Sequence, residues 1–165
     1  MFDDFKELLS IFNALSVKYL IVGGYAVSFH AQPRATKDID LLIKPNAGNA
    51  KAVYAALSKF GTPLDGITVE DFSDRKKFFR IGREPVAVDI LPEIDGIEFD
   101  DAWERRVEAV IDAESGLKVS FISNADLITS KLAAGRPQDI ADVAAIRKAV
   151  ESQPKAANET KEMQS

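Results

Sequence analysis

Apolar residues recur along the chain at two spacings, and these spacings divide the sequence into expected helices and strands. Near the N-terminus they recur every three or four positions, which predicts an amphipathic helix over residues 3–15, with Asp4 and Glu7 as a capping-box-like start. A short apolar run at 19–22 ends at two glycines and precedes a weakly helical stretch at 25–30. This order predicts a strand, a tight turn and a helix.

The same patterns continue through the middle of the chain. Apolar runs on both sides of residues 82–85 indicate a hairpin, because a short turn joins antiparallel strands. An alanine-rich stretch that stops at Gly61 and Pro63 indicates a helix. The segments predicted in this part are strands at 38–43, 78–81, 86–91, 107–111 and 117–121, and a helix at 50–60.

The C-terminal part is expected to be helical. A helix is predicted over residues 124–134, where Gly135 suits its C-terminal cap, and a proline opens a last helix over about 137–150. Residues 151–165 are polar and contain no aromatic side chain, so we expect a flexible tail. The predicted fold is one α/β (α+β) domain over residues 1–150, a small mixed sheet packed on helices and closed by a C-terminal helical pair.

Composition narrows the classes of function. The chain has no cysteine, which excludes disulfide scaffolds, thiolate nucleophiles and cysteine-ligated metals and fits a cytoplasmic protein. Its one histidine, His30, excludes a site built from several imidazoles, so a metal would rest mainly on carboxylates, as hard ions such as Mg2+ prefer. A net charge of −5 argues against a general phosphate-backbone binder. The acidic N-terminus, and the lack of an apolar run near ~20 residues, argue against export and membrane insertion.

Three aspartates stand where packing alone would favour apolar residues. Asp38 and Asp40 are two apart on an expected strand, so both carboxylates leave the same face, while Ile39 leaves the other. Asp89 interrupts the apolar strand at 86–91 in the same way. Carboxylates held together beside apolar surface are stabilised by a bound cation, an arginine partner or a raised pKa. The alternative is a strand end where the acids meet water.

Two glycines precede these acids in the chain. Gly23 and Gly24 follow a strand and open a helix, an arrangement that makes backbone N–H groups available to a phosphate. Tight turns also use such pairs routinely, so the pair alone is weak support. Asp38 lies fourteen positions after Gly24, which leaves room for a short helix and a return to a neighbouring strand. A phosphate cradle and metal-binding carboxylates could then face each other.

The chain resembles the nucleotidyltransferase fold typified by DNA polymerase β, and especially its small bacterial branch related to the abortive-infection AbiE-type toxins. The likeness covers most of residues 1–150. It lies in the segments at 23–30, 34–42, 88–91 and 131–142, which read GGYAVSFH, RATKDIDLL, VDIL and K…RPQDIAD.

This resemblance implies roles for the acids and the glycines. Asp38 and Asp40 would be the paired metal ligands and Asp89 the third carboxylate, together holding two Mg2+ ions and a nucleoside triphosphate while Asp89 orients or deprotonates the acceptor hydroxyl. Gly23 and Gly24 would contact the phosphates. Many relatives carry Gly-Ser where this chain has Gly-Gly, which removes one hydroxyl from the cradle.

Other residues of the matching segments are candidates for nucleotide binding. Lys131 falls on the apolar stripe of its helix, so its ammonium group either reaches a triphosphate or snorkels to solvent. Asp142 would orient Lys131 or contact the nucleotide, and is preferred to Asp139, which also suits the first turn of its helix. Arg34 would pair with Asp38 or Asp40 or reach a phosphate. Thr36 belongs to the same expected nucleotide-binding set.

Two further features have ordinary explanations. His30 more often caps a helix end by bonding to main chain than binds a ligand, although its position matches a histidine common in the resembling branch. Basic residues and phenylalanines interleave at 75–83, and we favour a hairpin edge protected by charge over a nucleic-acid patch. The basic residues are Arg75, Lys76, Lys77, Arg80 and Arg83.

The expected function is an Mg2+-dependent transfer of a nucleoside monophosphate from an NTP to an acceptor hydroxyl. The resemblance implies tRNA or a protein as acceptor, and a cognate antitoxin as a possible partner. A second hypothesis is a small-molecule enzyme of the aminoglycoside-modifying type, although such enzymes usually carry a larger C-terminal domain. A third is an inert nucleotide-binding or antitoxin-like module.

Overall fold

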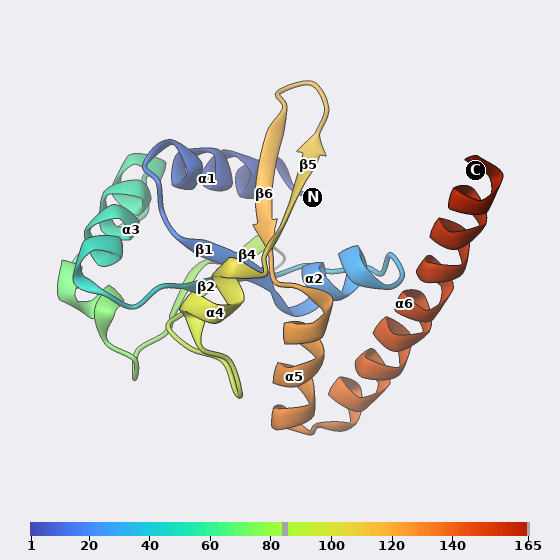
Figure 1. Cartoon of the computed structure of the whole chain (residues 1–165). Helices are drawn as coiled ribbons and strands as arrows, with labels where there is room; N and C mark the ends of the chain where they lie inside the picture. The colour runs from blue at the N-terminus through green and yellow to red at the C-terminus, as the bar shows by residue number, and fades with distance from the viewer. Residues whose placement is uncertain (84–85, 165) are drawn as a thin grey trace.

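The computed structural model describes residues 1–83 and 86–164, which form a six-stranded mixed sheet with helices on both faces (Figure 1). The elements in chain order are α1 (Asp3–Ala14), β1 (Tyr19–Val22), α2 (Gly23–His30), β2 (Ile39–Ile43), α3 (Ala47–Phe60), the 3-10 turn η1 (Val69–Ser73), β3 (Phe79–Arg83), β4 (Val86–Leu91), α4 (Phe99–Glu104), β5 (Val107–Asp112), β6 (Leu117–Phe121), α5 (Asn124–Ala134) and α6 (Pro137–Gln164). This arrangement confirms the predicted fold class.

The sheet has the order β3-β4-β2-β1-β6-β5, so β2 lies in its interior. β2 pairs in parallel with β4 and antiparallel with β1, while β1 pairs in parallel with β6. The outer hairpins β3–β4 and β5–β6 are antiparallel. The strand that carries Asp40 is therefore held by a neighbour on each side, which fixes its register and the face of every side chain.

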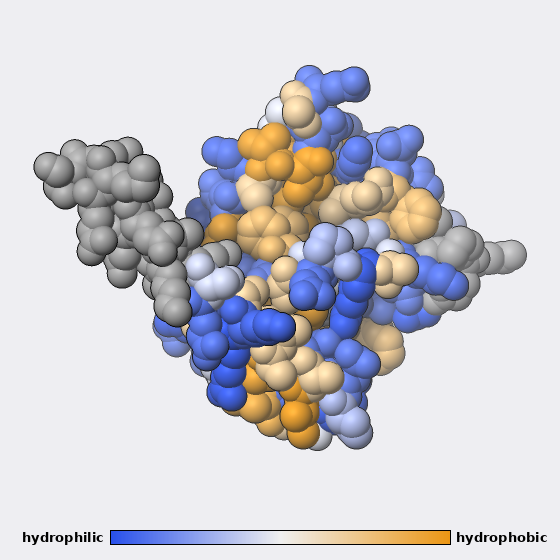
Figure 2. Space-filling view, turned by 90° about the vertical axis from the view of Figure 1, so that its right-hand side faces the viewer, coloured by the Kyte–Doolittle hydropathy of each residue, from blue (hydrophilic) through white to orange (hydrophobic). Residues whose placement is uncertain are grey.

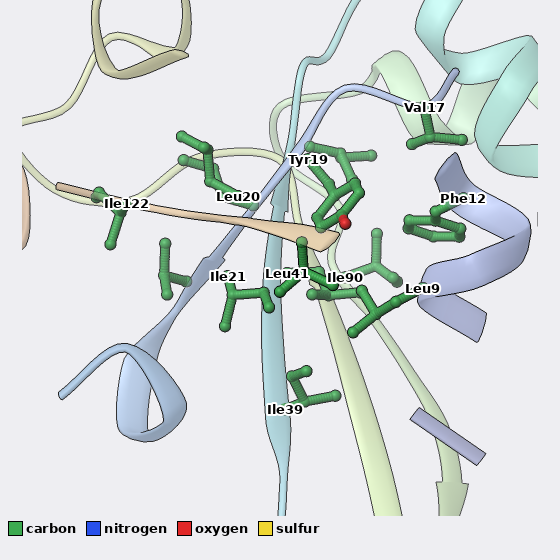
Figure 3. Close-up of a cluster of buried hydrophobic side chains, with 14 of the residues drawn as sticks. Leu9, Phe12, Val17, Tyr19, Leu20, Ile21, Ile39, Leu41, Ile90 and Ile122 are labelled. Atoms are coloured by element: carbon green, nitrogen blue, oxygen red, sulfur yellow. The ribbon is translucent and has the colours of Figure 1, made fainter. Parts of the chain in front are cut away.

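The hydrophobic core lies between α1, α3 and one face of this sheet. Leu9 and Phe12 of α1 are fully buried and belong to the same cluster as Leu41 of β2 and Ile90 of β4 (Figure 3). Burying one such side chain stabilises the fold by roughly 1.5–3 kcal/mol. Because side chains alternate along a strand, the residues between these apolar ones, including Asp40, point to the opposite face, where α5 lies.

The N-terminal helix is confirmed, but its predicted cap is wrong. Phe2 occupies the N-cap position and makes no side-chain cap hydrogen bond. The helix begins two residues earlier than a capping box at Asp4 requires, so Asp3 and Asp4 both lie in the first turn, where the helix dipole favours negative charge. The ring of Phe2 packs edge-on against Phe5, with centroids 5.6 Å apart.

Several predicted boundaries shift by a few residues. α2 begins at Gly23 itself, so the glycines form the first turn of the helix rather than a separate turn before it. α3 begins at residue 47 because the Asn46 side chain accepts a hydrogen bond from the Asn49 backbone N–H. α6 continues to Gln164 instead of ending near residue 150.

The patterns missed two short elements, η1 and α4, and part of the predicted hairpin turn at 84–85 lies outside the described residues. The division into a domain of residues 1–150 and a flexible tail stays a prediction. Of the helices in the two described ranges, none combines the length and apolar character needed to cross a bilayer.

The surface on the side of α6 mixes apolar and hydrophilic regions (Figure 2). Large apolar side chains that remain exposed include Phe29 of α2, Leu132 of α5 and Ile140 of α6. They come from the elements that surround the acidic face of the sheet.

Candidate active site

A row of side chains crosses three strands on the acidic face of the sheet. The register places Arg80 of β3 opposite Asp89 of β4, and Asp89 opposite Asp40 of β2. Directly opposed residues point to the same face, so these three side chains are adjacent. Asp38 lies two residues before Asp40 and is held to the same row through Arg80. The structure therefore brings together the three carboxylates that the sequence singled out.

Arg80 is the cation of this row. Its Nε donates to Asp89 Oδ1 at 2.9 Å and its Nη2 to Asp89 Oδ2 at 3.0 Å, a two-pronged contact, while Nη2 also lies 3.4 Å from Asp38 Oδ2. Arg80 lies on the edge strand β3, as the hairpin-edge interpretation expects, but it also pairs with two carboxylates of the row. The turn expected at 82–85 would have placed Arg80 opposite Ala87, so the sequence did not identify Asp89 as its partner.

The negative charge of the row exceeds what one arginine neutralises. Burial raises the pKa of Asp40 to about 7, and the nearby Asp89 and Asp38 carboxylates add to this rise, against the opposing effect of Arg80. The Asp89 and Asp38 side chains are only 14% and 28% exposed, so water screens their repulsion poorly. The site is thus suited to additional positive charge.

The two glycines have different neighbours, Asp40 for Gly23 and both Thr36 and Arg34 for Gly24. Gly23 adopts φ +66°, and a Cβ built there would overlap Asp40 Oδ2 and come within 2.9 Å of Asp40 Cγ. A Cβ on Gly24 would lie 2.8 Å from Thr36 Cγ2 and 3.6 Å from Arg34 Nη2. A serine at position 24 would thus press on Thr36, which accounts physically for Gly-Gly here. Val22, the N-cap residue of α2, makes no side-chain hydrogen bond to the first turn of the helix.

A second polar cluster joins α5 and α6. Lys131 Nζ lies 3.2 Å from Asp139 Oδ1 and 3.0 Å from Asp142 Oδ2, and its side chain is only 11% exposed. Arg136 Nε donates to Asp139 Oδ2 at 2.7 Å. Lys131 therefore points inward, and both aspartates orient it, although the sequence had favoured Asp142.

Ion pairs and hydrogen bonds lower the pKa values of both aspartates in this cluster. The hydrogen bond from Arg136 lowers the pKa of Asp139 to about 2, with Lys131 adding to the effect. Burial alone would raise the pKa of Asp142, but hydrogen bonds from Gln138 and Lys131 lower it below its usual value. Both side chains are therefore anionic at neutral pH, and their contacts hold Lys131 in place.

Arg34 does not pair with the carboxylates of β2. Its Nη1 donates to Asp142 Oδ1 at 2.7 Å, a contact between residues 108 positions apart in the chain. This corrects the expected pairing of Arg34 with Asp38 or Asp40. The contact ties the segment between α2 and β2 to α6 and places Arg34 near both Gly24 and Lys131.

One cavity of about 300 Å³ connects the acidic row with the α5–α6 cluster. Gly23 and Asp40 line it on one side, and Lys131, Arg136 and Asp139 line it on the other. This volume lies at the lower end of the range for small-molecule pockets. The cavity thus joins carboxylates, a glycine turn and fixed cations in one space.

His30 lies outside this arrangement. Its Nε2 is 2.6 Å from the carbonyl oxygen of Ile122, and burial lowers its pKa. This agrees with the main-chain-bonded interpretation of His30. Lys77, from the basic stretch, pairs with Asp71 at 2.7 Å.

Within residues 1–83 and 86–164, no three acidic or histidine side chains stand in positions to share one metal ion as they are. The guanidinium of Arg80, which contacts both Asp38 and Asp89, lies among the candidate ligands. The metal-binding role of the acids therefore stays a prediction.

Residues 1–151 match the family described as nucleotidyltransferase of unknown function (DUF6036), and the chain belongs to this family. No curated protein sequence matches it significantly.

Solved structures share the fold at low sequence identity. The lincosamide antibiotic adenylyltransferase LnuA, in its lincomycin-bound form, superposes with a TM-score of 0.54 at 17% identity over 89% of this chain and 96% of that one. The antibiotic-resistance factor ANT(2'')-Ia gives 0.53 at 16% identity over 97% and 96%. An antigenic nucleotidyltransferase-like protein from Paracoccidioides brasiliensis gives 0.51 at 17% over 86% and 72%. At these identities the likeness concerns the fold.

Proposed function

We propose that this protein transfers a nucleoside monophosphate from an NTP to an acceptor hydroxyl with the help of Mg2+. The observation that carries the proposal is the meeting of Asp38, Asp40 and Asp89 on one face of the sheet, where Asp40 lies against Gly23 and lines the cavity. Acids in apolar strands cost stability, and nothing in the core requires them there.

The donor set fits Mg2+. Oδ1 of Asp38 is buried and has no hydrogen-bond partner among the described residues, so an oxygen with full acceptor capacity lies in the acidic row. Carboxylate oxygens are the ligands that Mg2+ prefers. Asp38, Asp40 and Asp89 would hold the metal, and the resemblance implies two ions. When bound, such an ion neutralises charge on the reacting phosphate oxygens.

The chain's own groups would do the positioning. The first turn of α2, which begins at Gly23 and lacks a side-chain cap, would receive phosphate oxygens with its backbone N–H groups. Lys131, fixed by two aspartates, would hold the triphosphate from the opposite wall of the cavity. Asp89 would orient the acceptor hydroxyl or accept its proton. Arg34 and Thr36 flank Gly24 and would complete the nucleotide-binding set.

Two classes of acceptor remain as proposals. The resemblance to the AbiE-type branch favours tRNA or a protein acceptor, with a cognate antitoxin as partner. The fold likeness to LnuA favours a small-molecule acceptor, because 96% of that chain aligns and no larger additional domain is needed. The expectation that small-molecule enzymes need a larger C-terminal domain therefore does not count against this chain.

The central test is Asp40→Asn, assayed with each of the four labelled NTPs in the presence of total RNA, lysate protein or aminoglycoside and lincosamide antibiotics. We expect transfer to fall by at least about a thousandfold, the scale of losing a metal ligand in a reaction that depends on charge neutralisation. Glu114→Gln, at an exposed position of the β5–β6 hairpin, is the matched control and should retain transfer.

Calorimetry separates an enzyme from an inert module. The wild-type protein should bind an NTP in the presence of Mg2+ and lose that binding when the metal is chelated. Transfer by a folded Asp40→Asn variant at the wild-type rate would contradict the assigned role. NTP binding that is unchanged both by chelation of the metal and by Asp40→Asn would contradict the proposed site as a whole.

A further inference from the structure

The cation that completes the acidic row is an arginine side chain from the edge of the sheet. β3 is an outer strand, and Arg80 reaches from it across β4 to Asp38, which precedes β2. Its guanidinium contacts both oxygens of Asp89 and one oxygen of Asp38. One side chain therefore engages two of the three carboxylates that the proposed function assigns to a metal.

A divalent ion and the guanidinium would use the same oxygens. Asp89 accepts from Arg80 with both oxygens, at 2.9 Å and 3.0 Å, and also shares a hydrogen bond with Asp40. A metal ligated by Asp89 and Asp38 would stand within a few ångströms of a permanent positive charge, since arginine does not lose its proton at accessible pH. Like charges at that distance repel strongly when they are partly buried.

The contacts of Arg80 differ in length, which indicates which of them would break first when a metal binds. Of the three contacts described above, that with Asp38 is the longest, at 3.4 Å, whereas the Asp89 contacts have ideal lengths. The Arg80 side chain is 49% exposed, so part of it lies in solvent. Asp38 in turn carries the buried oxygen without a hydrogen-bond partner among the described residues.

We propose that Arg80 is an internal counter-ion that stands in for the divalent metal and competes with it, so that metal binding requires Arg80 to withdraw from Asp38. The inference rests on the proposed function, because it concerns the same carboxylates. In this second role, Arg80 sets the concentration of free metal at which the site becomes occupied. A site with this competitor stays neutralised when metal and nucleotide are absent.

The test measures the affinity of the protein for Mn2+ alone, by electron paramagnetic resonance of the free ion, without nucleotide. Arg80→Met and Arg80→Gln should bind Mn2+ about tenfold more tightly than wild type, the scale expected when a unit charge near a divalent ion is removed at a half-exposed site. Arg80→Lys keeps the charge and should stay near wild type.

Two further variants make the measurement specific. Lys77→Met removes a positive charge that pairs with Asp71 instead of the acidic row, so it should leave Mn2+ affinity unchanged. Adding Asp38→Asn to Arg80→Met should abolish the gain. Thermal unfolding in EDTA and in Mn2+ gives a second readout, because a ligand that binds the native state raises its melting temperature.

The outcomes separate this inference from the proposed function. If folded Arg80→Met and Arg80→Gln bind Mn2+ as wild type does, Arg80 does not compete and the inference is wrong, while the metal site stands. If they bind it more weakly, Arg80 holds Asp89 in place for the metal, and the inference is again wrong. If wild type and both variants bind no Mn2+ at millimolar concentration, the proposed metal site and the inference fall together.

Discussion

Replacing Gly23 by alanine tests the link between the glycine turn and the carboxylates. Two separate costs follow from the structure. The backbone of Gly23 has φ +66°, where a residue with a Cβ loses about 1–2 kcal/mol. The added Cβ would also overlap Asp40 Oδ2, so either the Asp40 carboxyl group must rotate away from Asp89 or the turn must shift.

Gly116 offers a control for the first cost alone. It has φ +70°, and a Cβ built there meets nothing within 4 Å. Gly116→Ala should therefore lose about 1–2 kcal/mol, equivalent to a fall in melting temperature of about 2–8 °C for a chain of this size. Gly23→Ala should lose at least about 1 kcal/mol more, because a carboxylate or backbone segment is displaced as well.

The assays are urea unfolding and Mn2+ binding, measured on both variants. We expect Gly23→Ala to weaken Mn2+ binding by at least about tenfold through the displaced Asp40, and Gly116→Ala to bind as wild type. Equal losses of stability in the two variants, together with unchanged Mn2+ binding by Gly23→Ala, would refute the reasoning.

Three other predictions concern the core, the α5–α6 cluster and His30. Phe12→Ala should lose about 3–5 kcal/mol of unfolding free energy in urea, because Phe12 is fully buried; a loss below 1 kcal/mol would contradict the packing. The pKa of Asp139 is lowered to about 2, so the stability that this carboxylate contributes is complete above its unfolded-state pKa of 3.8 and disappears as pH falls through 2. Asp139→Asn should therefore make the unfolding free energy less dependent on pH in that window. An acid unfolding curve that the substitution leaves unchanged would argue against these ion pairs. His30→Phe should cost about 1–3 kcal/mol by leaving the Ile122 carbonyl without this partner, yet retain nucleotide transfer, and loss of transfer by the folded variant would assign His30 a role in the reaction.

Local sequence patterns predicted much of the fold. The strand at Tyr19–Val22 has the predicted bounds, and the alternation around Asp40 and Asp89 correctly separated an apolar face from an acidic one. These successes share a cause, because alternation and helical spacing are set by neighbouring residues. η1 and α4 were missed since five or six residues are too few to show a period.

The partners of the charged residues were harder to predict. Arg34 pairs with Asp142, 108 residues away, and local spacing carries no information on which helix returns to that segment. Arg80 is different, because its pairing with Asp89 follows once the hairpin register is known. The position of Lys131 between Asp139 and Asp142 needed the packing of α6 on α5, which tertiary structure decides.

The pairing of β2 with β4 joins attraction on one face of the sheet to conflict on the other. Ile39 lies opposite Val88 and Leu41 opposite Ile90, so apolar contacts drive the two strands together, whereas the same register forces Asp40 against Asp89. The pairing is therefore locally frustrated, because the contact between the two carboxylates opposes the register that the apolar contacts favour. A divalent cation bound as proposed would relieve the repulsion between these carboxylates and leave the apolar contacts of the other face unchanged.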